Sequence, residues 1–235
     1  MQIAGIQKLT LIDYPGKIAC TLFTYGCNFR CGFCHNPELV TKQIQKSYSE
    51  QEILDFLEKR KKYLEGVCIT GGEPLLNLEK PFLKKIKEFG YLIKLDTNGS
   101  FPEKLKEMID ESLIDFIAMD IKASKEKYSL VANSNVDIDK IEQSIKLIAN
   151  SGLDYEFRTT ILKEFHDLEE IKKMADWLND LNSSQKPKKF ILQGFQNKGK
   201  FIDDSYKTKK DVEKEYLEEL KNEIKDSFEE IEIRA

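Results

Sequence analysis

Six short apolar segments recur along the chain, and this repetition limits what the chain can fold into. The segments span residues 18–24, 66–70, 91–96, 114–121, 153–161 and 189–195. Apolar runs of this length are typical of strands that are buried on both faces, as in a parallel sheet. Because parallel strands need helical crossovers between them, the chain is predicted to be an α/β protein built from strand–helix units.

Helix signals occupy the gaps between these segments. Ser49 and Glu52 have the spacing of a capping box. Further helices are predicted over residues 102–108, 141–148, 167–178 and 209–228. Six units are too few for a closed eight-unit barrel, so we expect a partial (β/α)6 TIM-like barrel. The two ends, 1–13 and 229–235, are predicted to add edge strands.

The composition is that of one enzyme domain over residues 1–235. Its 37 basic and 41 acidic residues are well mixed, and the net charge of −4 offers no basic surface for nucleic acid. No apolar run reaches about 18 residues, the length of a membrane span, and the N-terminus lacks the pattern of a signal peptide. We therefore expect a cytoplasmic protein with neither a nucleic acid nor a membrane as partner.

Three cysteines, Cys27, Cys31 and Cys34, form a C-x3-C-x2-C motif directly after the first apolar segment. Three thiolates can hold three irons of a 4Fe–4S cluster and leave the fourth iron open to a substrate. Structural zinc is the alternative, but it needs a fourth ligand, and the nearest candidate, His35, directly follows Cys34. A disulfide framework is disfavoured because the chain has only five cysteines and no secretory signal.

Chemically active residues also follow the later apolar segments. Parallel α/β sheets place their chemistry at the carboxyl ends of the strands, where these residues should meet. The sequences at those ends are Gly71-Gly72-Glu73-Pro74, Asp96-Thr97-Asn98-Gly99 and Met119-Asp120-Ile121-Lys122, and Arg158 lies within the fifth segment.

With these motifs together, the chain resembles the radical S-adenosylmethionine enzymes. The cysteine motif and the Gly71–Pro74 sequence carry this resemblance. Asp13-Tyr14-Pro15-Gly16-Lys17, Cys34-His35-Asn36-Pro37 and Asp96-Thr97-Asn98-Gly99 are similar to the glycyl radical enzyme activases. These include the pyruvate formate-lyase activating enzyme and the anaerobic ribonucleoside-triphosphate reductase activating proteins. The resemblance covers about residues 9–195.

The resemblance implies that the three cysteines bind one 4Fe–4S cluster and that its open iron binds S-adenosylmethionine. Gly71 and Gly72 would let the methionine end approach the backbone closely. Glu73 would offer a carboxylate to the methionine ammonium, and Pro74 would stiffen the turn. A plain surface turn is the alternative for this motif. No side chain is expected to be catalytic beyond the cluster and the cofactor.

Four more residues are implied to contact S-adenosylmethionine. Phe33 would face the adenine, Asn98 would bind the ribose or methionine region, and Arg158 and Lys122 would reach the carboxylate. The alternatives are packing of the loop for Phe33, a salt bridge within the barrel for Arg158, and pairing with Asp120 for Lys122. The pyruvate formate-lyase activating enzyme has a histidine near the position of Phe195, so its ribose contact does not carry over to this chain.

The same resemblance implies a monovalent cation. Asp96 and Asp120 would supply carboxylates and Thr97 a hydroxyl, and hard oxygen ligands of this kind suit Na⁺ or K⁺.

The implied activity is generation of a glycyl radical on a partner enzyme, such as anaerobic ribonucleotide reductase or a pyruvate formate-lyase-like enzyme. Flavodoxin or ferredoxin would supply the electron. Asp13 would lie near the partner's glycine loop, with a plain turn into the first strand as the alternative. Two other functions stay open: a radical enzyme that acts on a small molecule, and an iron–sulfur protein that only carries or senses electrons.

The remaining residues of chemical interest are expected to be structural. Cys20 and Cys68 lie within apolar segments and should behave as small core residues. Trp177 lies on an apolar helix stripe and should be buried, whereas His166 is expected in an exposed loop.

Overall fold

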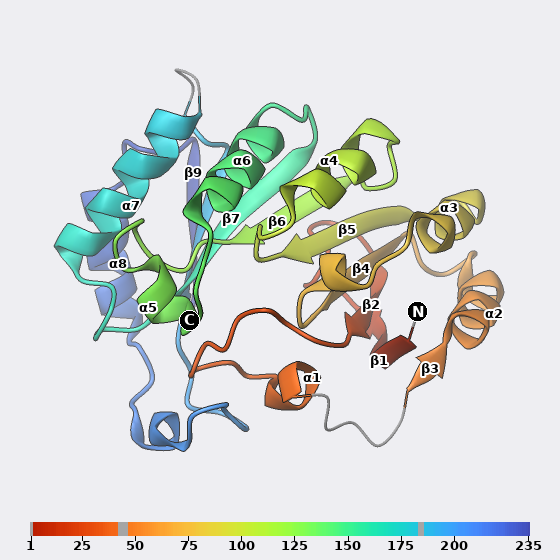
Figure 1. Cartoon of the computed structure of the whole chain (residues 1–235), viewed down its shortest axis with the longest axis horizontal. Coiled ribbons are helices and arrows are strands. Elements are labelled where there is room, and N and C mark those ends of the chain that lie inside the picture. The colour runs from red at the N-terminus through yellow and green to blue at the C-terminus, as the bar shows by residue number, and fades with distance from the viewer. Residues whose placement is uncertain (1, 42–46, 183–185) are drawn as a thin grey trace. The chain divides into compact units, whose positions relative to one another are not determined.

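The computed structural model describes residues 2–41, 47–182 and 186–235 (Figure 1). Its contacts divide the chain into two compact units. The first unit comprises Met1–Asn28, Asn36–Thr97 and Glu103–Ala118, and the second comprises Phe29–His35, Asn98–Pro102 and Met119–Ala235. The single domain expected over residues 1–235 stays a prediction, and Met1, residues 42–46 and residues 183–185 lie outside the described part.

The strands of the first unit follow the order β3-β1-β2-β4-β5. They are β1 (Gln2–Thr10), β2 (Ala19–Thr24), β3 (Tyr48–Ser49), β4 (Gly66–Gly71) and β5 (Leu92–Thr97). Strands β2, β4 and β5 are parallel, as their apolar runs predicted. The predicted N-terminal strand, β1, is also present and pairs antiparallel with β2. It was expected at the edge of the sheet, but the short β3 pairs with its first two residues on the outer side.

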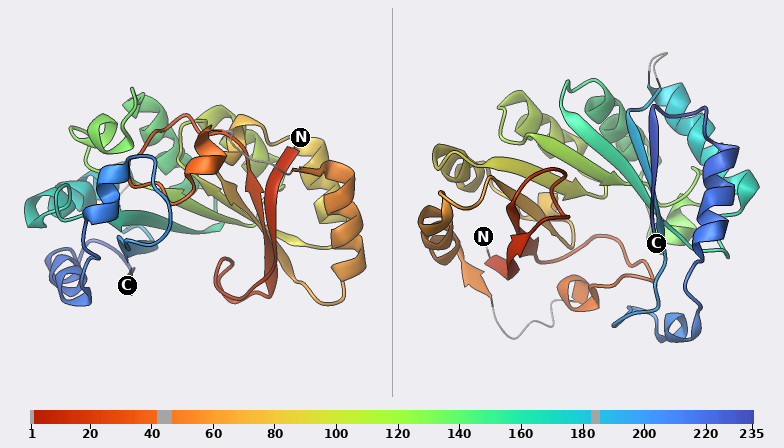
Figure 2. Two further views of the ribbon diagram at one scale, coloured as in Figure 1. Left: turned by 90° about the horizontal axis from the view of Figure 1, so that it is seen from below. Right: turned by 180° about the vertical axis from the view of Figure 1, so that it is seen from behind.

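The helix that follows Ser49 in the first unit begins at the predicted capping box. The helices of this unit are α1 (Pro37–Thr41), α2 (Glu50–Arg60), α3 (Lys80–Glu88) and α4 (Pro102–Asp110), which starts at the boundary between the units. The capping box is confirmed, because the Ser49 hydroxyl accepts from the Glu52 N–H and the Glu52 carboxylate accepts from the Ser49 N–H at 2.8 Å. Helices α2 and α3 lie side by side (Figure 2).

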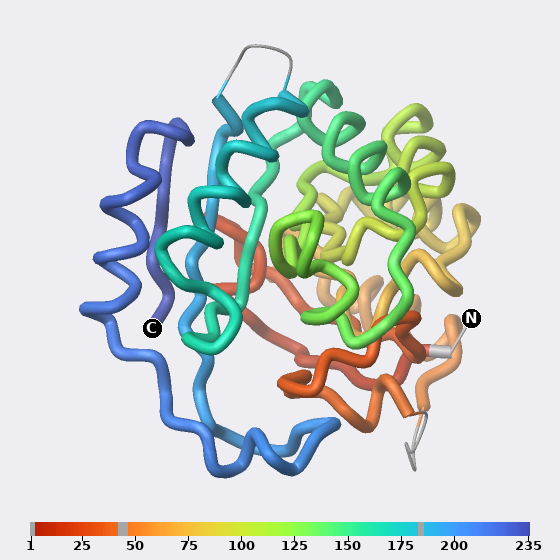
Figure 3. Tube along the Cα trace, turned by 60° about the vertical axis from the view of Figure 1, so that its left-hand side comes forward, coloured from red at the N-terminus to blue at the C-terminus, as the bar shows by residue number. Residues whose placement is uncertain are grey.

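The second unit contains the parallel strands β7 (Asp154–Ile161), β8 (Lys189–Gly194) and β9 (Glu230–Arg234). Strand β6 (Phe116–Asp120) carries the boundary between the units. Helices of this unit are α5 (Tyr128–Ala132), α6 (Ile138–Ala149), α7 (Leu168–Leu181) and α8 (Lys214–Glu223), and α8 packs along β8 and β9 (Figure 3). The predicted C-terminal strand is therefore confirmed, and Trp177 on α7 is buried as expected.

The last helix is shorter than the predicted span of 209–228. A 3-10 helix, Asp204–Thr208, comes first, and α8 begins only at Lys214. The Asn197 side-chain amide donates to the Lys207 and Lys209 carbonyls at 2.8 and 2.7 Å, and the Asp211 carboxylate accepts from the Asn197 N–H at 2.6 Å. These side-chain bonds hold the chain in a loop, because they compete with the hydrogen bonds of a helix.

Candidate functional site

The segment Phe29–His35, called here the cysteine loop, carries two of the three motif cysteines within the second unit. Cys34 donates its N–H to the Cys31 carbonyl at 3.1 Å, which closes a turn between the two thiols. A Cβ added to Gly32 would lie 2.7 Å from a ring carbon of Tyr206, so a larger residue at position 32 would clash with the Tyr206 ring. Cys31 is 7% exposed, and burial raises the pKa of its thiol although the Lys122 ammonium opposes the shift.

The donor set fits an iron–sulfur cluster. None of the five cysteines, all of which the structure describes, forms a disulfide. Within the described ranges, no group of three or more His, Cys, Asp or Glu side chains is placed to hold a single metal ion. A cubane cluster does not require that arrangement, because each cysteine binds a different iron. Binding would release protons from the thiols, since the ligand is the thiolate.

The Gly71–Pro74 turn follows β4 in the first unit and packs against the chain that follows β2. An added Cβ would lie 2.4 Å from the Thr24 nitrogen at Gly71 and 1.9 Å from the Gly26 carbonyl oxygen at Gly72. Gly71 also has a φ of +123°, a conformation that favours glycine. We expected these glycines to let a ligand approach the backbone. The structure shows that the absence of side chains lets the protein's own backbone, at Thr24 and Gly26, pack against them.

Glu73 is completely buried and holds this turn together. Its carboxylate accepts hydrogen bonds from the Leu75 N–H at 3.1 Å and from the Thr97 hydroxyl at 2.8 Å. The first bond caps the 3-10 helix Pro74–Leu76, and the second ties the turn to the end of β5. Glu73 and Pro74 are therefore a buried part of this turn, whereas Gly71 and Gly72 are half-buried.

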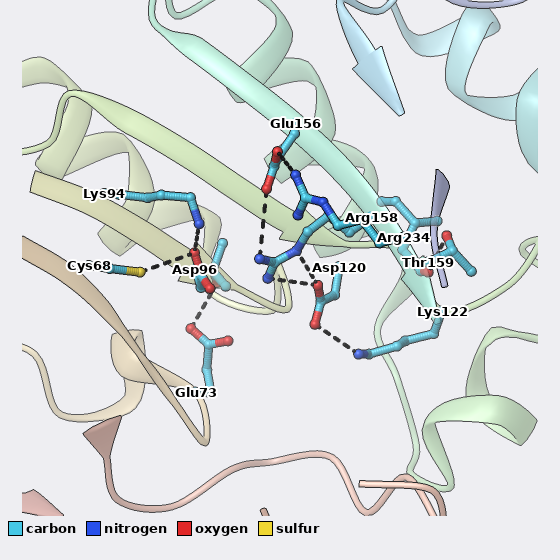
Figure 4. Close-up of polar contacts among 12 residues, drawn as sticks. Cys68, Glu73, Lys94, Asp96, Asp120, Lys122, Glu156, Arg158, Thr159 and Arg234 are labelled. Atoms are coloured by element: carbon cyan, nitrogen blue, oxygen red, sulfur yellow. Dashed lines mark hydrogen bonds and ion pairs between the residues drawn. The ribbon is translucent and has the colours of Figure 1, made fainter. Parts of the chain in front are cut away.

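Asp96 in the first unit has a partner that the sequence analysis overlooked. The Lys94 ammonium forms a short ion pair with the Asp96 carboxylate, and the Lys94 side chain is only 1% exposed (Figure 4). The Cys68 thiol lies 3.8 Å from the same carboxylate, because the β4–β5 register sets Cys68 beside Lys94. A lysine in an apolar strand, two residues before an aspartate on the same face, was the signal for this pair.

Asp120 in the second unit lies between two cations (Figure 4). Lys122 approaches one carboxylate oxygen at 3.1 Å, and Arg158 approaches the other through Nε at 3.0 Å and Nη2 at 2.9 Å. Partial burial favours the protonated acid, but the Lys122 and Arg158 charges prevail and lower the pKa of Asp120 to about 2. The alternatives stated for Arg158 and Lys122, pairing within the protein, are therefore what the structure shows.

A second carboxylate, Glu156, extends this network and was not expected from the sequence. It is 1% exposed and lies 3.1 Å from Arg234 on β9 and 3.8 Å from Arg158 (Figure 4). Two arginines thus neutralise a buried acid, which would otherwise be costly to bury.

The expectation that His166 is exposed is wrong. The ring is completely buried, and its Nδ1 accepts from the Leu162 N–H at 3.1 Å. Its Nε2 therefore carries the proton and donates to the Lys122 carbonyl at 2.9 Å. Burial lowers the pKa of His166, so the ring is neutral and fixes the backbone of Lys122.

Phe33 and Asn98 both support loops in the second unit. Phe33 is buried, and its ring packs edge-on against Tyr206 with the ring centroids 6.0 Å apart. The Asn98 side chain accepts from the Ser100 N–H at 3.0 Å and shapes its own turn.

The turn at Asp13 is present in the first unit. Lys17 donates its N–H to the Tyr14 carbonyl at 3.1 Å, and Gly16 has a φ of +69°. The Asp13 carboxylate accepts from the Thr21 hydroxyl at 2.5 Å, and Lys17 pairs with Glu65 at 3.6 Å.

The expected core cysteines are confirmed, because Cys20 and Cys68 are both completely buried. Among the described residues, no helix is long and apolar enough to cross a membrane.

Comparison with known proteins agrees with these observations. The profile of the Radical SAM superfamily matches residues 21–178. A Methanocaldococcus jannaschii protein named as a glycyl-radical enzyme activating enzyme is 30% identical over 87% of this chain and 84% of its own length. The pyruvate formate-lyase-activating enzyme of Clostridium pasteurianum is 28% identical over 79% of each chain.

A solved structure shows the same fold. The crystal structure of Streptococcus suis SuiB bound to S-adenosylmethionine superposes with a TM-score of 0.69 at 16% identity, over 90% of this chain and 49% of SuiB. The expected α/β fold of the partial-barrel type is thereby confirmed. The matched profile includes all three motif cysteines and the Gly71–Pro74 turn, and this chain belongs to the Radical SAM superfamily.

Proposed function

We propose that this protein is a glycyl radical enzyme activating enzyme, which cleaves S-adenosylmethionine reductively and generates a glycyl radical on a partner protein. The observation that carries the proposal is similarity over most of the chain to relatives named for this activity. The C-x3-C-x2-C motif supports it, because three cysteine ligands leave one iron of a 4Fe–4S cluster open.

The chain's own residues would bind and orient the cofactors. Cys27, Cys31 and Cys34 would hold the cluster, which supplies the electron that breaks a carbon–sulfur bond of S-adenosylmethionine. Burial of Cys31 and Phe33 excludes water around the loop. No other side chain is proposed to take part in bond breaking.

The other predicted contacts are proposed with the roles that the resemblance implies. Gly71 and Gly72 would let the methionine end approach the backbone, Glu73 would offer its carboxylate to the methionine ammonium, and Pro74 would stiffen the turn. Asn98 would bind the ribose or methionine region, and Phe33 would face the adenine. Lys122 and Arg158 would bind the methionine carboxylate. They would either leave Asp120 to do so or bind both carboxylates at once. The proposed partners are a glycyl radical enzyme and a flavodoxin or ferredoxin, and the proposed location is the cytoplasm.

The reconstituted protein should produce a glycyl radical on a co-encoded glycyl radical enzyme. Electron paramagnetic resonance after anaerobic mixing with S-adenosylmethionine and dithionite would show the radical. The partner with its glycine replaced by alanine is the control. Cleavage of S-adenosylmethionine without a radical on any co-encoded partner would favour a small-molecule substrate, and the absence of cleavage would favour an electron carrier.

The same experiment tests Asp13, which is proposed to help dock the partner's glycine loop. Asp13→Ala should slow radical formation while uncoupled cleavage of S-adenosylmethionine stays nearly unchanged, because the methionine site is built from other residues. Equal loss of both activities would show that the Asp13–Thr21 hydrogen bond only supports the fold.

We also propose a Na⁺ or K⁺ ion that is bound by Asp96, Thr97 and Asp120. Each carboxylate already has a cationic partner within its own unit, so the ion would have to compete with Lys94 or with Lys122 and Arg158. Affinity for S-adenosylmethionine, measured by equilibrium dialysis, should fall about tenfold, or about 1.4 kcal/mol, when choline replaces K⁺. Asp96→Asn should remove this dependence and leave the iron content intact. Equal affinity in choline, Na⁺ and K⁺ would rule the ion out.

A further inference from the structure

The segment between β8 and α8 covers the cysteine loop and is rich in lysine. Residues 196–210, called here the lysine segment, contain five lysines and two aspartates, although the whole chain has a net charge of −4. Both the lysine segment and the cysteine loop belong to the second unit. From the sequence, only its last two residues were expected to be structured, as the start of a helix.

Backbone and ring contacts attach the lysine segment to the cysteine loop. Asp203 donates its N–H to the Gly32 carbonyl at 3.1 Å, and Tyr206 packs against Gly32 and Phe33. The Tyr206 hydroxyl donates to Glu164 at 3.0 Å, which anchors the segment to the loop that follows β7.

A second set of contacts involves His35, which directly follows Cys34. Its ring stacks on Phe195 with centroids 5.9 Å apart and lies 5.2 Å from the Phe201 ring. The His35 Nδ1 lies 3.3 Å from the Lys198 carbonyl oxygen, and Nδ1 is the donor because a carbonyl oxygen can only accept. The lysine segment thus packs directly on residues that neighbour the motif cysteines.

The apolar side chains of the lysine segment point inward and its charges face the solvent. Phe201 and Tyr206 are 5% and 7% exposed, whereas Lys198, Lys200, Lys207 and Lys210 are exposed. Lys207 remains 52% exposed although it pairs with Asp204. Surface ion pairs of this kind contribute little to the free energy of unfolding, so stability of the fold does not explain why lysines are concentrated here.

We infer that the lysine segment is the docking surface for the electron donor, a small acidic protein with a one-electron flavin or iron–sulfur centre. This inference rests on the proposed function, because only a redox enzyme needs such a donor. The donor would lose one electron, the cluster would gain it, and no atom would be transferred. Exposed lysines would attract an acidic surface and speed the encounter, and the buried aromatic rings beneath them would keep the path to the cysteine loop short and dry.

Transient redox partners typically bury less than about 1,200 Å² and depend on charge more than on a large apolar contact. A short segment with exposed lysines around a buried aromatic base suits that kind of interface. The end of α2 at Lys59, Lys61 and Lys62 is also basic and exposed, but it belongs to the first unit, whereas the cysteine loop belongs to the second. That end provides a matched control.

The test compares the triple variants K198E/K200E/K207E and K59E/K61E/K62E, which change the charge equally. Reduction of the reconstituted cluster by fully reduced flavodoxin is followed by stopped-flow absorbance at several salt concentrations. Binding of flavodoxin to the reconstituted protein is measured by anaerobic titration calorimetry. The lysine-segment variant should be reduced at least about tenfold more slowly at low salt and should lose most of its salt dependence. Its affinity for flavodoxin should fall as well.

Dithionite should still reduce the cluster in both variants and support cleavage of S-adenosylmethionine, which separates a docking defect from failure of the proposed function. Iron content and thermal melting serve as checks of the fold. Unchanged reduction and binding in the lysine-segment variant, or an equal defect in the α2 variant, would overturn the inference.

Discussion

Replacing any one of Cys27, Cys31 and Cys34 with alanine is expected to remove the iron–sulfur cluster. Anaerobically reconstituted wild-type protein should hold about four irons per chain, and each variant close to none, because two remaining thiolates cannot retain a cubane against solvent. Cleavage of S-adenosylmethionine should disappear with the cluster. Iron and sulfide analysis, together with electron paramagnetic resonance of the reduced protein, measures the effect.

Cys20→Ala and Cys68→Ala are the matched controls and should keep the cluster. Both side chains are completely buried within strands, and burial raises the pKa of Cys20 to about 12, so its thiol stays protonated and is a poor ligand. Loss of iron in Cys68→Ala would show that a fourth cysteine ligates the cluster and that no iron is open.

Gly72→Ala is expected to destabilise the first unit strongly. The new methyl group would lie 1.9 Å from the Gly26 carbonyl oxygen, and this oxygen also accepts a hydrogen bond from the Glu73 N–H at 2.7 Å. Because a backbone oxygen held in this way cannot move aside, the cost should reach or exceed the upper end of the about 1–3 kcal/mol range for overpacking. Thermal melting of the cluster-free chain should shift down by about 2–4 °C for each kcal/mol lost.

Gly5→Ala provides the control for this prediction. Its new methyl group would lie 3.7 Å from the nearest atom, a ring carbon of Phe23, which is an ordinary contact. Its melting temperature should stay within about 2 °C of the wild type, because this half-buried position has room for the methyl group and the cost should be at most about 0.5 kcal/mol. Equal melting temperatures for Gly72→Ala and the wild type would mean that the turn after β4 does not pack on Gly26.

Features that depend on neighbours in the sequence were predicted well. The apolar runs of β2, β4, β5, β7 and β8 matched the structure to within about two residues, because a run buried on both faces has the same pattern wherever it lies. The caps at Ser49 and Asp167 were also correct, since a cap requires only residues three apart. The last helix was misjudged because the Asn197 side chain, ten or more residues away, binds the backbone there.

The fold class and the superfamily could be predicted from the sequence, and the spacing of three cysteines within a short segment predicts the cluster ligands. Which charged side chains pair with one another depends on the tertiary contacts. Arg158 pairs with Asp120, which lies 38 residues earlier in the chain, and the buried His166 ring binds the Lys122 carbonyl. Position 72 must be glycine because the Gly26 carbonyl, in the loop that follows another strand, lies too close for a side chain. These contacts arise where separate strands come together, and the free energy of burying a charge depends on partners that no local pattern reveals.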